Sequence, residues 1–190
     1  SPQSRSSGNR RCAPQGAIEG IPTIVKDALQ LTKQELSQFD VVVNATSAFT
    51  PDMYHLPADL TLLLVKALAN TNTRLIAIGG AGSLYVDEDH TVQLNDTPEF
   101  PTEFLVRSKT HGKSDDILRK FSNVDCTMFT PPPILDAEGP ESNDYVLGNE
   151  NVILNKEGKP YLSYTTFAQI LVDEIKNHKF GRQRFTAVQI

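Results

Sequence analysis

The chain has 190 residues, 39% of them apolar and 22% charged, with a formal charge of −5 and a sequence pI near 5.3. An acidic surface gains nothing from counterion release, so this charge argues against nucleic acid and against an anionic membrane as partners. No apolar run reaches the roughly 20 residues that cross a bilayer, and the N-terminus shows no apolar signal segment, so we expect a cytoplasmic protein.

The first 16 residues differ in composition from the rest of the chain. SPQSRSSGNRRCAPQG contains three arginines, no acidic residue and almost nothing that could be buried. We therefore expect a disordered or atypical N-terminal arm over residues 1–16 and a single domain over residues 17–190. Cys12 lies in this arm and Cys126 in an apolar run, so we expect neither a disulfide nor a metal site.

The first predicted elements lie between residues 21 and 71. IPTIV (21–25) is a short β-branched run, and TKQELSQF (32–39) opens with the capping-box pattern of a short helix. DVVVNA (40–45) is a continuous apolar run, typical of a strand buried on both faces of a parallel sheet. Residues 57–71 carry apolar side chains at helical spacing after a proline, which predicts a helix.

Strands and helices continue to alternate in the second half of the chain. RLIAIGG (74–80) predicts a strand that ends in glycines. After it we expect a helix over 100–121, a strand over 124–133, a hairpin around 144–158, a helix over 165–178 and a last strand over 182–190. This alternation predicts an α/β fold, a Rossmann-like three-layer sandwich with a mainly parallel sheet.

The glycine-rich stretch LIAIGGAGSLY (75–85) is the first candidate for a ligand site. A dinucleotide fingerprint would need a third spaced glycine and a following helix, but Tyr85 occupies the glycine position and an acidic loop follows. The stretch comes at the carboxyl end of a predicted central strand, where open α/β sheets bind ligands. On spacing alone, a ligand loop with Ser83 as a hydrogen-bonding group and a tight turn with no function fit equally well.

Several motifs in fixed order carry a resemblance to a known family. They include VVVNATSAF, LIAIGGAGSLY, DTPEFPTEF, CTMFTPPPILD and RQRFTAV. Over about residues 17–190 the chain resembles the NADH-flavin reductase-like group of atypical short-chain dehydrogenases, which is related to NmrA-like proteins. The resemblance implies an oxidoreductase that uses NADP or NAD and transfers a hydride to or from a flavin, a quinone or a small carbonyl substrate.

The resemblance also implies the site residues. Ser83 takes the position of the dehydrogenase catalytic serine, where it polarises the substrate or positions the nicotinamide. No metal is implied. The implied cofactor-binding residues are Asn44, Ala45, Thr46, Gly79, Gly80, Thr130 and Pro131.

The chain departs from the family pattern in two places. The first strands and the glycine turn of the family have no counterpart, so we expect an N-terminally incomplete fold. The helix over 100–121 lacks the Tyr-x-x-x-Lys dyad, and Phe104 stands near the place of the tyrosine. On the same helix we interpret Lys109, His111 and Lys113 as a solvated basic face.

Two alternatives to a small-molecule oxidoreductase therefore stay open. One is a catalytically silent Rossmann module that senses a nucleotide or binds a protein, and the other is a truncated form that binds no cofactor. A sheet edge left open by absent strands would also favour a homodimer through strand pairing.

Overall fold

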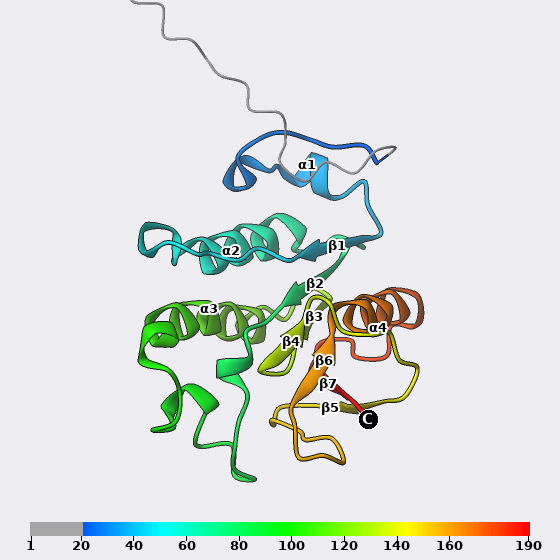
Figure 1. Cartoon of the computed structure of the whole chain (residues 1–190). Helices are drawn as coiled ribbons and strands as arrows, with labels where there is room; N and C mark the ends of the chain where they lie inside the picture. The colour runs from blue at the N-terminus through cyan, green and yellow to red at the C-terminus, as the bar shows by residue number, and fades with distance from the viewer. Residues whose placement is uncertain (1–20) are drawn as a thin grey trace, which may run out of the picture.

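The computed structural model describes residues 21–190, so the predicted arm over residues 1–16 lies outside the described part. A central sheet lies between two helical layers (Figure 1). Its strand order is β1-β2-β3-β7-β5, with every neighbouring pair parallel except β5 with β7. The strands are β1 (Val41–Asn44), β2 (Arg74–Ile78), β3 (Cys126–Phe129), β5 (Tyr145–Gly148) and β7 (Arg184–Gln189). The predicted α/β class with a mainly parallel sheet is confirmed.

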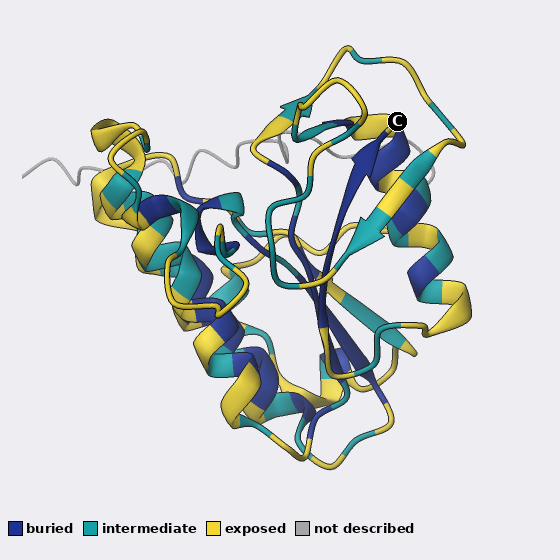
Figure 2. Ribbon diagram, turned by 90° about the horizontal axis from the view of Figure 1, so that it is seen from below, coloured by how far each residue is buried: buried dark blue, intermediate teal, exposed yellow. Residues whose placement is uncertain are grey.

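The helical layers bury opposite faces of the sheet. The α-helices are α1 (Lys33–Leu36), α2 (Leu56–Leu68), α3 (Thr102–Lys120) and α4 (Tyr164–Asn177), and the short 3-10 turns are η1 (Ala28–Gln30), η2 (Pro51–Met53), η3 (Ala81–Ser83) and η4 (Leu94–Asp96). Helices α2 and α3 pack on one face against Leu75, Ala77 and Met128. Helix α4 packs on the other face against Phe129 and Phe185. Figure 2 shows the buried strands between the exposed outer sides of these helices.

The N-terminal part of the described chain confirms some of the predictions made from the sequence and corrects others. The capping box at α1 is present, since Thr32 accepts from the Glu35 backbone and Glu35 accepts from the Thr32 backbone. The predicted strand over 40–45 forms as β1, but it is an edge strand with Val43 37% exposed rather than a strand buried on both faces. Residues 21–25, which were predicted as a β-branched run, form no strand in the described chain.

The predicted hairpin around 144–158 is wrong. Strand β5 pairs with β7, in the register Tyr145 with Gln189 and Gly148 with Thr186, so its partner lies far along the chain. A second, two-stranded parallel sheet joins β4 (Ile134–Asp136) to β6 (Tyr161–Ser163) and was not predicted. Helix α3 runs without a break through Gly112. None of the helices in residues 21–190 is long and apolar enough to cross a membrane.

Candidate active site

The glycine loop over residues 79–83 follows β2 at the carboxyl edge of the sheet and continues into η3 rather than into an α-helix. Its glycines allow the loop to lie directly on α3. A Cβ on Gly82 would stand 2.0 Å from Ser108 Oγ, and a Cβ on Gly80 would stand 2.9 Å from His111 Nδ1. Side chains at these positions would push the loop off the helix. The loop therefore needs its glycines for close packing against α3.

Ser83, the predicted catalytic residue, is buried at the inner end of this loop with 3% of its surface exposed. Its hydroxyl donates to the Gly80 carbonyl at 2.9 Å and accepts from the Arg184 guanidinium. The Ser83 carbonyl accepts a second bond from Arg184 Nη1 at 2.9 Å. The hydroxyl thus holds the loop to β7.

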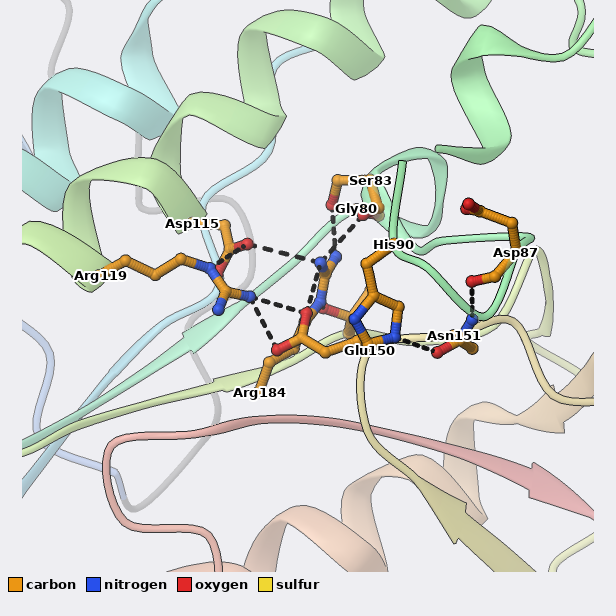
Figure 3. Close-up of polar contacts among 10 residues, drawn as sticks. Gly80, Ser83, Asp87, His90, Asp115, Arg119, Glu150, Asn151 and Arg184 are labelled. Atoms are coloured by element: carbon orange, nitrogen blue, oxygen red, sulfur yellow. Dashed lines mark hydrogen bonds and ion pairs between the residues drawn. The ribbon is translucent and has the colours of Figure 1, made fainter. Parts of the chain in front are cut away.

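Arg184 is the centre of this buried polar network (Figure 3). Its side chain is 1% exposed, and its Nε donates to Thr130 Oγ1 at 3.1 Å. Its Nη1 lies 3.4 Å from Asp115 Oδ2 and 3.5 Å from Glu150 Oε2. Burial lowers the pKa of Arg184, and the charges of Asp115 and Glu150 oppose that shift. Arg184 joins β7, β3, α3 and the glycine loop.

Arg119, on the exposed side of α3, pairs with the same two carboxylates as Arg184. Its guanidinium bonds Asp115 at 2.9 Å and Glu150 at 2.7 Å. Burial opposes ionisation here, but the hydrogen bond to Glu150 and the charge of Asp115 outweigh it and raise the pKa of Arg119. Two cations thus share two carboxylates, so no member of the network is left with an uncompensated buried charge.

The structure brings the predicted cofactor residues to one edge of the sheet. Parallel pairing aligns the carboxyl ends of β1, β2 and β3. Asn44 is the last residue of β1 and Ala45 and Thr46 follow it, while Thr130 and Pro131 follow β3. Between them, a Cβ on Gly79 would stand 2.4 Å from Thr130 Oγ1.

Two of these side chains already serve the fold. The amide of Asn44 donates to Thr61 Oγ1 at 3.2 Å and accepts from the Thr46 backbone at 3.1 Å. Thr130 is fully buried beside Arg184. Of the predicted site residues, Gly80 is the one that lines the cavity described next.

A cavity of about 620 Å³ lies between the glycine loop and α3. Phe100 and Phe104 contribute aromatic wall, and Arg107, Ser108 and His111 contribute polar groups from α3. A volume of this size with apolar walls and a few polar groups is typical of a site for a small organic ligand. The residues that face it on α3 were missed at the sequence level, because the helix was interpreted as solvated.

That interpretation of the basic face is corrected by the structure. Lys109 forms an ion pair with Asp96, and Lys113 is exposed, but His111 lies in the cavity wall. Burial, together with the nearby charge of Arg107, lowers the pKa of His111 from 6.5. His111 is therefore a neutral imidazole at neutral pH, able to donate one hydrogen bond and accept another.

The fit of a dinucleotide differs between its two ends. The cavity beside the carboxyl edge of the sheet has the volume and the apolar walls to take a ring such as that of a nicotinamide. Within residues 21–190 no glycine-rich turn opens an α-helix, so the described chain offers no cradle of that kind for a pyrophosphate.

The chain is similar to several known proteins, although no family model matches it. YwnB, an uncharacterized protein of Bacillus subtilis (strain 168), is 36% identical over 171 residues, which cover 90% of this chain and 80% of YwnB. The crystal structure of SP1627, a proposed NADH-flavin reductase from Streptococcus pneumoniae TIGR4, has a TM-score of 0.88 and 35% identity over 93% of this chain and 84% of SP1627.

A more distant similarity concerns the fold alone. A wide-type short-chain dehydrogenase/reductase from Veillonella parvula DSM 2008, whose crystal contains NADP, has a TM-score of 0.57 and 19% identity over 83% of this chain and 66% of that chain. This similarity shows that the two proteins share a fold.

Proposed function

Since the chain belongs to the NADH-flavin reductase-like group of atypical short-chain dehydrogenases, we propose that it is an NAD(P)H-dependent oxidoreductase whose acceptor is a flat flavin, quinone or small carbonyl compound. The nicotinamide, when bound, supplies the hydride. The chain's own residues hold the acceptor in the cavity between the glycine loop and α3. That cavity is the observation that carries the proposal.

The roles of the residues follow from their places. Phe100 and Phe104 offer apolar contact to a ring. Ser83 and Arg184 keep the glycine loop in place, so Ser83 acts here as a positioning residue. Of the predicted cofactor positions, Asn44–Thr46 and Thr130–Pro131 lie along the same edge, where a nicotinamide would approach the acceptor.

The test is oxidation of NADPH and of NADH by the purified full chain, with riboflavin and with a fully substituted quinone as acceptors. We expect saturable turnover, and about tenfold lower kcat/KM for Phe104→Ala because the ring loses a wall of its site. Lys113→Ala is the matched control, since Lys113 is exposed on the same helix and away from the cavity. Absence of oxidation with every acceptor would refute the proposal.

A second candidate is a catalytically silent module that binds nucleotide. The engagement of the Ser83 hydroxyl by Arg184 favours it, together with Phe104 in place of a tyrosine. This candidate predicts that NADPH or NADH raises the melting temperature while no acceptor is reduced. The same preparation therefore separates the two functions.

A further inference from the structure

Four residues of α3 form one stripe along the cavity. Phe104, Arg107, Ser108 and His111 are spaced by three and four residues, so they share one face of the helix. The stripe is aromatic at the N-terminal end of α3 and carries three hydrogen-bonding side chains farther along. A ligand that fills the cavity therefore meets a row of donors along one of its sides.

Ser108 carries a hydroxyl that accepts a hydrogen bond from a buried amide. Its Oγ accepts from Asn95 Nδ2 at 3.1 Å, and it lies against Gly82 across the helix–loop contact. No acceptor for the hydroxyl hydrogen of Ser108 is found among residues 21–190. Asn95 is 4% exposed and its Oδ1 has no partner in the same region, so its amide serves Ser108 alone. The Ser108 hydrogen is left for a ligand.

Arg107 adds a charged donor beside it. One of its nitrogens donates to Ser47 Oγ at 3.0 Å, and its guanidinium carbon stands 4.7 Å from the centre of the Phe49 ring. Within the described residues no carboxylate lies within ion-pair distance of Arg107, and Glu99, an acidic residue of the cavity lining, is exposed. The remaining guanidinium donors are available to an oxygen in the cavity.

We infer that Ser108 and Arg107 together recognise a carbonyl oxygen of a flat aromatic acceptor, and that Asn95 positions Ser108 for this contact. The inference rests on the proposed function. Ser108 and Arg107 are half-buried, and a ligand seated against them would cover their donors, so a ligand without the oxygen would leave these donors unpaired. Apolar shape alone would discriminate much less.

The same pair suits the chemistry of quinone reduction. A bound nicotinamide would supply a hydride, which is two electrons and one proton. A quinone that accepts it would become a hydroquinone monoanion, and the nicotinamide would be left oxidised. A proton from water then completes the hydroquinone. The negative charge develops on an oxygen, where the guanidinium of Arg107 stabilises it more strongly than it stabilises the neutral carbonyl. Arg107 is thus expected to affect kcat as well as affinity.

The experiment compares duroquinone with durene, which has the same methylated ring without the two oxygens. Binding is measured by calorimetry on the full chain in the absence of nicotinamide. We expect the wild type to bind duroquinone at least about tenfold more tightly than durene. Ser108→Ala and Arg107→Gln should each reduce that preference by about tenfold, while Lys113→Ala leaves it unchanged.

The outcomes separate this inference from the proposed function. Equal affinity of the wild type for both compounds, no binding of either, or a preference that survives in both Ser108→Ala and Arg107→Gln would overturn the carbonyl contact. NADPH oxidation by duroquinone at the wild-type rate in Ser108→Ala and Arg107→Gln would uphold the oxidoreductase and refute this contact. A carbonyl preference that these variants lose, without any turnover, would support the contact and refute the oxidoreductase.

Discussion

Replacing Arg184 with methionine tests the buried network that holds the glycine loop. The substitution removes the hydrogen bonds to the Ser83 carbonyl at 2.9 Å and to Thr130 Oγ1 at 3.1 Å. It also removes the ion pairs to Asp115 and Glu150 at 3.4 and 3.5 Å. Loss of one partner from a buried ion pair costs about 3–5 kcal/mol, because the remaining charge and dipoles stay buried without compensation.

That cost is large compared with the whole stability of a domain, which is about 5–15 kcal/mol. With about 2–4 °C lost per kcal/mol for a chain of this length, the melting temperature of Arg184→Met should fall by roughly 6–20 °C. Urea unfolding followed by circular dichroism measures the free energy directly. Arg182→Met is the matched control, because Arg182 is exposed two residues earlier and bonds only the Ser122 carbonyl among its described contacts. Its expected cost is below about 1 kcal/mol.

Arg184→Lys should give an intermediate result, since lysine keeps the charge but cannot reach Ser83, Thr130 and the carboxylates at once. A free energy of unfolding for Arg184→Met within about 1 kcal/mol of the wild type would refute the view that this network holds the loop.

Three further predictions concern the loop, the cavity and the surface. Gly82→Ala should cost about 1–3 kcal/mol and weaken duroquinone binding, because its Cβ would stand 2.0 Å from Ser108 Oγ; unchanged stability and affinity would contradict the packing argument. The pKa of His111 should lie below 6.5 by NMR titration and rise in Arg107→Gln, because burial and the charge of Arg107 both disfavour the imidazolium; a midpoint above 6.5 would count against a buried ring. Hydrogen bonds from Thr91 and Val92 lower the pKa of Asp87 from 3.8 to about 2, so its stabilisation is present above pH 3.8 and lost as the pH falls through 2. The melting temperature of Asp87→Asn should therefore fall less steeply than that of the wild type as the pH is lowered from 3.8 to 2. The same dependence of melting temperature on pH in both proteins would show that these bonds do not stabilise the fold.

Local signals in the sequence predicted the helices well. The capping box at Thr32 and Glu35 depends on residues three apart, and α2 and α4 follow apolar spacing within one segment. Strand pairing depends on partners elsewhere in the chain. IPTIV has the composition of a strand, but residues 21–25 pair with no strand of the described chain, and β5 pairs with β7 instead of with the segment that follows it.

The site was predictable in part for the same reason. The glycines after β2 indicated that the backbone there lies close to another group, and the structure shows that Gly80 and Gly82 lie against α3. The partner of Ser83 could not be predicted, because Arg184 lies about a hundred residues away in a wholly buried strand. Arg184, the second of two arginines in RQRFTAV and the one next to the apolar end of that segment, is the signal that could have indicated a buried ion pair.

The most direct test of the account is anaerobic turnover with NADPH and duroquinone, in which nicotinamide oxidised and hydroquinone formed are measured together in the wild type and in Arg107→Gln. The account predicts one hydroquinone per nicotinamide, with kcat/KM at least about tenfold lower in the variant. Wild-type protein that binds NADPH or duroquinone but forms no hydroquinone would contradict the assignment as an oxidoreductase and would favour a silent nucleotide-binding module.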